Sequence, residues 1–303
     1  MQPEKQKVIE FPAGPSDESP QRSEPAAAAM PIEPISPMAE RRRKLPTSRT
    51  PPAAPPPPKL ADYEPIIGNA ELDELRLLAA DQRGKTVKMV NSTSMGGGVA
   101  EMLNRLVPLL AELEVPTHWE VITGGNDFFE ITKGFHNALQ GGDYHLTTEI
   151  EQIFLGCNER NRERMRFDED LVVIHDPQPA ALIRARQDTH GKWVWRCHID
   201  LSNPNRDVWE FLRPMVEQFD ATIFSSPSFA RQLSIPQFLF FPCIDPLSEK
   251  NKELDDSVVQ KVCDDFGIDR SRPIVTQVSR FDRLKDPVGV IRAYKMAKQS
   301  ADC

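Results

Sequence analysis

Side chains that could bind or transform a small ligand gather in four stretches of this sequence. The first is His175-Asp176, followed by Pro177-Gln178-Pro179. It comes directly after the apolar run Leu171–Ile174, and residues just beyond the carboxyl end of a parallel strand face the ligand crevice. A histidine beside an aspartate offers a hydrogen-bond donor and an acceptor for sugar hydroxyls. The alternative is a capped turn with a satisfied histidine.

The second stretch is a run of three glycines, Gly96, Gly97 and Gly98. It lies between an apolar run typical of a strand, Thr86–Val90, and a helical pattern that begins at Val99. Glycines there let the backbone approach an anion, and the helix N-terminus supplies free N–H groups and partial positive charge. The spacing is not G-x-G-x-x-G, so a dinucleotide fingerprint is unsupported. We therefore predict an anion or sugar-phosphate site, with a tight structural turn as the alternative.

The third stretch, residues 193–202, mixes tryptophans with polar side chains. Arg196, His198 and Asp200 alternate and would share one face of a strand. Aromatic faces suit the C–H surfaces of sugars, which points to a sugar site. The alternative is that Trp193 and Trp195 belong to the core and the strand lies at the surface.

The fourth stretch holds two cations, Arg280 and Lys285, in a loop between a predicted strand and a predicted helix. Two cations there suit a diphosphate. At ~4 Å and an effective dielectric constant of ~20, each charge pair is worth roughly 4 kcal/mol before desolvation. The alternative is an ordinary solvated loop. No H-E-x-x-H motif and no Cys/His cluster is present, so we predict no metal site.

Strands and helices alternate along the chain, which predicts an α/β fold with a doubly wound, mainly parallel, Rossmann-like sheet over residues 62–248. Most of the strand candidates are short and continuously apolar, as in a sheet covered on both faces. The other predicted strands are Val121–Thr123, Ala221–Ser225, Phe238–Phe241 and Ile274–Val278. The predicted helices are Glu71–Ala80, Val99–Leu113, Ile150–Arg166, Arg206–Gln218, Ser257–Phe266 and one from Pro287 to about Lys298, with Asp286 as its N-cap.

Composition divides the chain near residue 60. Fifteen of the 28 prolines lie in residues 1–60, so we expect a disordered, proline-rich tail over 1–61. The rest holds 28 Lys/Arg against 38 Asp/Glu, which argues against nucleic-acid binding. No apolar run reaches the ~18 residues of a membrane span, and no secretory signal is visible. The five scattered cysteines suit reduced thiols, so we expect a cytoplasmic protein.

Six segments together resemble the glycosyltransferring trehalose synthases, which are family 4 glycosyltransferases of the two-Rossmann-domain GT-B fold. The likeness covers roughly residues 63–298 and leaves out the tail. The segments are VNSTSMGGGVAEMLNRLVPLL, ITKGFHNALQG, VVIHDPQPAALI, WVWRCHIDLSNPNRDVWEFL, PCIDPLSEKN and QVSRFDRLKDPVGVI. The resemblance implies that 62–248 is the acceptor-binding N-terminal domain. Residues 249–303 would be a linker helix and the first strand–helix unit of a truncated nucleotide-sugar domain.

The resemblance also implies roles for the residues above. His175 and Asp176 would lie beside the reacting glucose, and Gln178 would join the sugar-binding set. The acceptor side would be lined by Arg196, His198 and Asp200, and the donor phosphates would be held by Gly96, Gly97, Gly98, Arg280 and Lys285.

The implied reaction is a retaining glucosyl transfer from a nucleoside-diphosphate glucose to glucose, giving trehalose. The donor is a co-substrate, and no tightly bound cofactor is expected. Glucose and the nucleotide-sugar are the expected small-molecule partners, and a homodimer or a separate C-terminal half the expected protein partners. Two alternatives stay open: a trehalose phosphorylase type of enzyme, and a sugar-binding remnant without catalysis.

Overall fold

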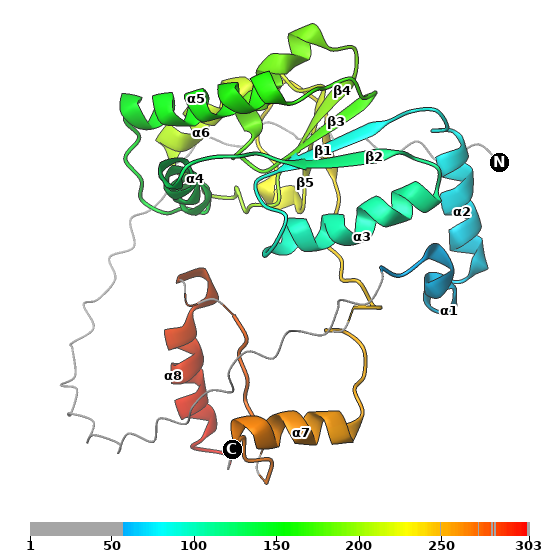
Figure 1. Ribbon diagram of the computed structural model, residues 1–303. Coiled ribbons are helices and arrows are strands. Elements are labelled where there is room, and N and C mark those ends of the chain that lie inside the picture. Colours follow the sequence, from blue (N-terminus) through cyan, green and yellow to red (C-terminus); the bar gives the residue numbers. More distant parts are fainter. Residues whose placement is uncertain (1–56, 249, 272, 280, 282, 302–303) are drawn as a thin grey trace. The chain divides into compact units, whose positions relative to one another are not determined.

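The computed structural model describes residues 57–248, 250–271, 273–279, 281 and 283–301. The chain forms two compact units, one ending at Cys243 and the other beginning at Ile244 (Figure 1). Most of the predicted disordered tail lies outside the described residues. Its last part starts a 3-10 turn, η1 (Leu60–Tyr63), in which Leu60 is buried.

The first unit is built on a six-stranded sheet in the order β2-β1-β3-β4-β5-β6. All five strand pairings are parallel, which confirms the predicted doubly wound α/β fold. The strands are β1 (Val87–Asn91), β2 (Thr117–Val121), β3 (Leu171–His175), β4 (Lys192–Arg196), β5 (Ala221–Phe224) and β6 (Gln237–Leu239).

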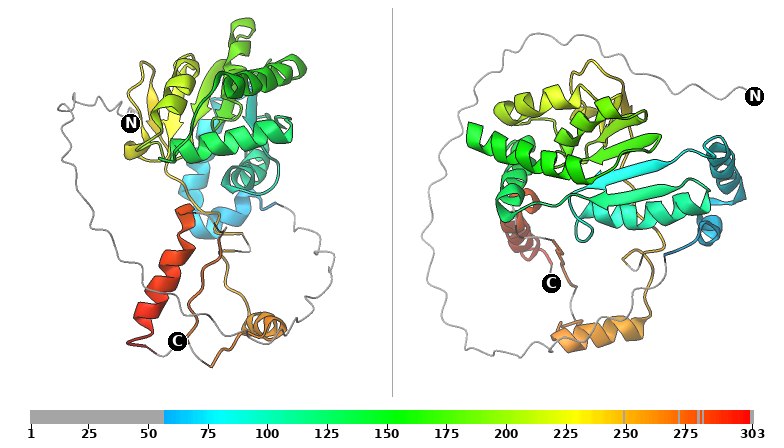
Figure 2. Two further views of the ribbon diagram at one scale, coloured as in Figure 1. Left: turned by 90° about the vertical axis from the view of Figure 1, so that its left-hand side faces the viewer. Right: turned by 45° about the horizontal axis from the view of Figure 1, so that its top comes forward.

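Helices cover the two faces of this sheet and make three layers (Figures 1 and 2). One face packs against α2 and α3 through a core that includes Met89, Leu103 and Val173. The other face packs against α4, α5, η2 and α6 through a larger core. The helices of this unit are α1 (Glu64–Ile67), α2 (Asn69–Ala80), α3 (Gly98–Glu112), α4 (Asn126–Leu139), α5 (Thr148–Arg164), η2 (Ala180–Asp188), α6 (Arg206–Val216) and the short η3 (Pro227–Phe229).

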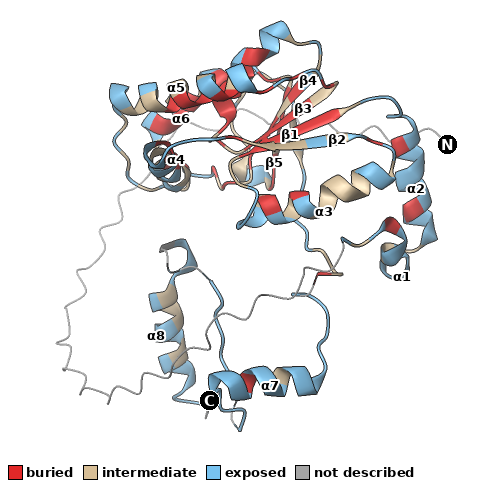
Figure 3. Cartoon of the chain, in the orientation of Figure 1, coloured by how far each residue is buried: buried red, intermediate tan, exposed pale blue. Residues whose placement is uncertain are grey.

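Burial explains why β1 and β3 could be predicted from apolar runs in the sequence. Every residue of β1 is buried, and so are four of the five in β3, because helices cover both faces (Figure 3). Trp193 and Trp195 are fully buried in the larger core. They belong to the core, so the expectation that their faces meet a sugar is wrong.

Two parts of the first unit differ from the predicted elements. The strand expected at Val121–Thr123 ends at Val121, because β2 is an edge strand with a mixed polar sequence, Thr117-His118-Trp119-Glu120-Val121, and not a continuous apolar run. The helices α4 and η2 are not among the predicted elements. Both pack buried side chains into the larger core.

The second unit contains α7 (Asp256–Phe266), η4 (Arg283–Lys285) and α8 (Pro287–Ala297). Asp286 is the N-cap of α8, as predicted, and its Oδ1 accepts a hydrogen bond from the Gly289 N–H at 2.9 Å. The segment 274–278, predicted as a strand, forms no strand, and its residues are exposed. A parallel strand needs a neighbour for its N–H and C=O groups, and the described part of this unit contains no strand beside it. No helix among the described residues has the length and apolarity to cross a membrane.

Candidate functional site

The strand order places a topological switch point between β1 and β3. The chain passes from β1 to β2 on one side and continues with β3 on the other side of β1. In open parallel sheets, ligands bind beyond the carboxyl ends of the strands at such a point. The glycine loop follows β1, and Asp176 follows His175 at the end of β3. Two of the four predicted stretches therefore flank the switch point.

Side chains from β1 and β2 hold the first part of the glycine loop. Asn91 Nδ2 donates to the carbonyl of Thr93 at 2.8 Å, and Asn91 Oδ1 accepts from Trp119 Nε1 at 2.9 Å. The hydroxyl of Thr93 donates to the carbonyl of Met95 at 2.6 Å. These residues are not among the predicted site residues, although an Asn at the end of a buried strand and before a glycine run is a usable signal.

The glycines themselves are exposed and have open space around them. Gly96 and Gly97 have φ values of 72° and 86°, which explains why glycine is needed at both. Gly98 begins α3 with no positive φ, and a Cβ atom added there would meet no atom within 4 Å. Packing within the described residues therefore does not require glycine at position 98, and a bare backbone at the N-terminus of α3 suits close approach of an anion.

His175 and Asp176 end β3 in a tightly held conformation. His175 is 3% exposed and pairs in register with Arg196 of β4. Asp176 has φ 65°, an uncommon left-handed conformation for a residue other than glycine. Its N–H donates to the Arg196 carbonyl at 2.9 Å, and its own carbonyl accepts from Trp195 Nε1 at 2.9 Å. The neighbouring strand thus fixes a backbone conformation of the kind that concentrates at functional sites.

His198 lies against both residues. Its Nε2 is 3.0 Å from Nδ1 of His175, and the two rings lie edge to edge and nearly in one plane, at 16° with centroids 5.3 Å apart. Its backbone N–H donates to Oδ1 of Asp176 at 2.7 Å. The structure therefore brings together three of the predicted site residues from two neighbouring strand ends.

Burial dominates the protonation of this cluster. Burial lowers the pKa of His175 to about 3, with further lowering by His198 and Arg196. Burial and the nearby Arg196 lower the pKa of His198 to about 4. Burial raises the pKa of Asp176 to about 7, against the opposing effects of the His198 N–H and Arg196. Both histidines are therefore neutral at pH 7, and Asp176 titrates near that pH.

Arg196 is buried and makes hydrogen bonds with the protein. Its Nη1 donates to the carbonyl of Phe224 at 3.1 Å, and its Nη2 donates to the carbonyl of Phe240 at 2.8 Å and to Ser225 Oγ at 3.4 Å. These contacts tie β4 to the segments that follow β5 and β6. Burial also lowers the pKa of the Arg196 guanidinium.

The predicted shared strand face of Arg196, His198 and Asp200 is wrong, because β4 ends at Arg196. His198 and Asp200 lie in the loop that follows. Asp200 is partly exposed, and its Oδ1 accepts from the Ser202 N–H at 2.8 Å.

Gln178 lies in the loop after β3, close to a buried asparagine of α5. Asn158 Nδ2 donates to the Gln178 carbonyl at 3.0 Å and to the Phe154 carbonyl at 3.1 Å. Gln178 Oε1 and Asn158 Oδ1 are buried and have no hydrogen-bond partner among the described residues. Asn158 was missed, although a polar residue on the buried side of a helix marks such a contact.

The two predicted diphosphate-binding cations belong to the second unit. Arg280 lies outside the described residues. Lys285 ends η4 and is exposed, and its carbonyl accepts a hydrogen bond from Gln277 Nε2 at 2.7 Å. Their joint role in diphosphate binding stays a prediction.

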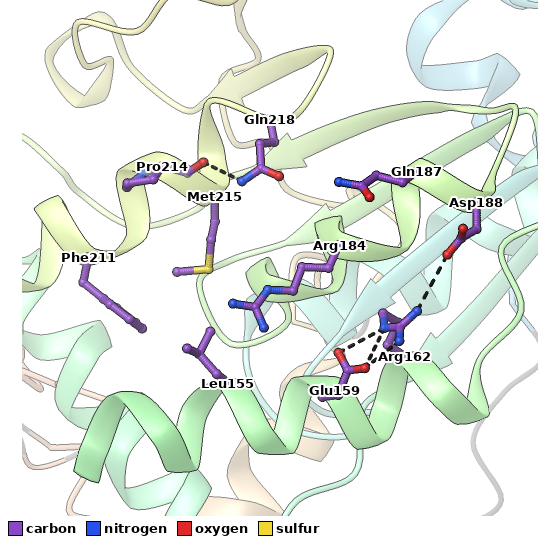
Figure 4. Close-up of a pocket in the computed structure, with 10 residues that line it drawn as sticks. All are labelled: Leu155, Glu159, Arg162, Arg184, Gln187, Asp188, Phe211, Pro214, Met215 and Gln218. Carbon is purple, nitrogen blue, oxygen red and sulfur yellow. Dashed lines mark hydrogen bonds and ion pairs between the residues drawn. The ribbon is translucent and has the colours of Figure 1, made fainter. Parts of the chain in front are cut away.

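A hollow of about 640 Å³ lies elsewhere on the first unit, among α5, η2 and α6 (Figure 4). Several of its residues come just before β4 and β5, which places it toward the amino ends of the strands. None of the predicted site residues lines it. Its lining residues are Leu155, Glu159, Arg162, Arg184, Gln187, Asp188, Phe211, Pro214, Met215 and Gln218.

A parallel sheet with a glycine loop and a buried polar cluster at its switch point is typical of a Rossmann-like domain. Residues 89–231, which span β1 to β5, match the family described as "Trehalose synthase, N-terminal domain". This match, together with the curated relatives below, supports a likeness to the trehalose synthases.

Curated relatives extend this match over most of the chain. It is 44% identical to a protein named trehalose synthase from Thermococcus litoralis over 245 residues, 80% of this chain and 59% of that protein. The corresponding protein from Rubrobacter xylanophilus is 43% identical over 248 residues, 79% of this chain and 59% of that protein. The chain thus spans about 59% of the length of these relatives.

More distant likenesses are also found. A trehalose phosphorylase from Pleurotus pulmonarius is 28% identical over 272 residues, 78% of this chain and 37% of that protein. A solved structure, the alpha,alpha-trehalose 6-phosphate synthase from Burkholderia multivorans, shares 16% identity with a TM-score of 0.36, over 48% of this chain and 41% of that one. This structural likeness is too remote to support a statement about the chain.

Proposed function

We propose that the chain supplies the acceptor-binding part of a retaining glucosyl transfer that makes trehalose from a nucleoside-diphosphate glucose and glucose. One observation carries the proposal. In a chain that resembles the trehalose synthases, the glycine loop after β1 and the His175–Asp176 pair at the end of β3 flank the switch point of the sheet.

The geometry suits sugar and phosphate chemistry. Neutral His175 and His198 present hydrogen-bonding nitrogens that suit hydroxyl groups, and Asp176 can donate or accept near pH 7. The N-terminus of α3, left bare at Gly98, would stabilise negative charge on the departing diphosphate. Arg196 would act indirectly, by holding the ends of the strands, because its guanidinium donates to protein carbonyls.

The proposed reaction needs no protein nucleophile. The acceptor hydroxyl attacks the anomeric carbon from the face of the leaving group, the bond from that carbon to the phosphate oxygen breaks, and this oxygen takes the acceptor's proton. Positioning and electrostatic stabilisation then supply the rate enhancement. Gln178 and Asp200 are proposed to contact the acceptor. Arg280 and Lys285, with a second Rossmann-like domain begun after residue 248, are proposed to bind the donor diphosphate.

The test has a binding arm and an activity arm. Calorimetry of the full chain with glucose should show binding that His175→Ala weakens at least tenfold, while the control His145→Ala, at an exposed histidine, leaves it unchanged. Incubation with glucose and nucleoside-diphosphate glucoses should yield trehalose, reduced by Arg280→Ala combined with Lys285→Ala. Folded chain that neither binds glucose nor makes trehalose, even with the C-terminal part of a relative added, would overturn the proposal.

A phosphorylase function is the second candidate, because proteins named trehalose phosphorylase share 28–30% identity with this chain. Orthophosphate would then replace the nucleoside diphosphate. Release of glucose 1-phosphate from trehalose that depends on orthophosphate, with no trehalose formed from nucleotide-sugars, would favour this candidate.

A further inference from the structure

The contact between His175 and His198 constrains both imidazole rings. Nδ1 of His175 and Nε2 of His198 are 3.0 Å apart, so one of these nitrogens must carry a proton and the other must not. In each neutral ring, the remaining nitrogen has the opposite state. Fixing the tautomer of one ring therefore fixes that of the other.

The other ring nitrogen of His175 is Nε2. It is buried and has no hydrogen-bond partner among the described residues. Buried polar atoms are nearly always satisfied, and those that are not mark a strain reservoir, a functional role or a missing ligand or water. At the carboxyl end of β3 beside the switch point, a ligand hydroxyl is a chemically suitable partner.

The His198 ring is held in place from several directions. The backbone N–H of His198 donates to Oδ1 of Asp176, and the backbone carbonyl of Asp176 accepts from Nε1 of buried Trp195, so the backbone that carries the ring is fixed. The in-plane contact between the two ring nitrogens, with the rings at 16°, orients the His198 ring against His175. His198 itself is partly exposed, so its free nitrogen can exchange a proton with solvent or a ligand.

We propose that His198 is a positioning residue: its Nε2 pairs with Nδ1 of His175 and so couples the two tautomers, which governs whether the buried Nε2 of His175 donates to a sugar hydroxyl or accepts from it. The inference rests on the proposed sugar site and deepens it. It also changes the expected role of His198, from a direct acceptor ligand to a residue that acts through His175.

Nitrogen-15 NMR of the full chain, labelled at histidine, tests this directly. In the wild type we expect His175 and His198 to be neutral at pH 6, with one proton on the facing pair of nitrogens. In His198→Phe, which keeps an aromatic ring but removes the nitrogen, the tautomer populations of His175 should change. His198→Gln can place an amide near the position of Nε2 and should again give Nδ1 of His175 a hydrogen-bond partner, which returns the tautomer populations toward those of the wild type.

Glucose affinity, measured by calorimetry on the same variants, gives the functional readout. His198→Phe should weaken binding about tenfold, the size of one lost hydrogen bond, while His198→Gln should stay within about threefold of the wild type. The exposed control His145→Phe should change neither measurement. A His175 tautomer that is unaltered in folded His198→Phe would overturn the inference, as would unaltered glucose affinity in that variant.

The two proposals fail separately. The tautomer measurement needs no sugar, so it decides whether His198 governs His175 whatever the ligand. Wild-type chain that shows complementary tautomers but no glucose binding would count against the proposed function alone. Glucose binding that His198→Phe leaves intact would count against the positioning role alone.

Discussion

His175 should lower the stability of the first unit on acidification, with His198 acting in the same direction and Asp176 in the opposite direction. In the folded chain His175 has a pKa of about 3, because burial disfavours its charged form. In the unfolded chain its pKa returns to about 6.5. Between these values the unfolded state binds a proton that the folded state does not, so stability rises with pH through this window and falls on acidification. Above pH 6.5 the effect disappears.

The size of the effect follows from the two pKa values. Lowering the pH from 7 to 5 should lower the free energy of unfolding by about 2 kcal/mol through His175 alone, at 1.36 kcal/mol for each pH unit below 6.5. His175→Gln removes this titration. The pKa of His198 is lowered mainly by its own burial and by Arg196, so its contribution should persist in that variant.

The assay is urea denaturation at pH 7 and at pH 5, followed by the fluorescence of the buried tryptophans Trp193 and Trp195. The drop in free energy between the two pH values should be about 2 kcal/mol smaller in His175→Gln than in the wild type. His145→Gln, at an exposed histidine, should leave the drop unchanged. An equal drop in the wild type and in His175→Gln would refute the reasoning.

Three further substitutions test other parts of the site. Because the pKa of Asp176 is raised, the free energy of unfolding falls as pH rises from about 4 to about 7. Asp176→Asn should therefore remove a loss of about 2 kcal/mol between pH 5 and 7, measured in the same urea series. An unchanged loss would contradict the explanation by burial. Gly97→Ala forces an alanine to φ 86° and should lower stability by about 1–3 kcal/mol, whereas Gly98→Ala should lower it by under about 1 kcal/mol. Equal losses for the two variants in thermal melts would contradict the role given to the positive φ of Gly97. Arg196→Met removes the hydrogen bonds of the guanidinium to Phe224, Ser225 and Phe240 and should cost about 3 kcal/mol, whereas Arg186→Met at an exposed ion pair should cost under about 1 kcal/mol. A small loss for Arg196→Met would argue that Arg196 does not hold these segments together.

Much of the sheet and half of the site could be predicted because burial leaves a clear mark in the sequence. β1 and β3 are covered on both faces and read as apolar runs. Once the sheet is known to be parallel, the residues after these strands must gather at one edge, which places Gly96–Gly98 and His175-Asp176.

The features that could not be predicted depend on contacts between residues distant in the sequence, which local sequence patterns do not show. The strand that carries Arg196 ends at that residue, and nothing in the alternation of polar residues shows this. The segment 274–278 has β-branched, apolar residues, yet propensity alone forms no strand without a neighbour. The helix α4 was missed, although Phe128, Thr132, Phe135 and Leu139 lie at helical spacing and are all buried.

Arg196 connects several chain segments at the edge of the candidate site, so these segments should unfold locally as one unit. Its guanidinium joins the end of β4 to the carbonyls of Phe224 and Phe240, and the Phe240 N–H donates to that same Phe224 carbonyl at 2.9 Å. Segments joined in this way open together, as one cooperative unit of local unfolding. Hydrogen exchange at the Cys197 and Phe240 amides should therefore report one common opening free energy. A ligand that secures the end of β4 would then slow exchange as far along the chain as Phe240, three residues before the first unit ends at Cys243.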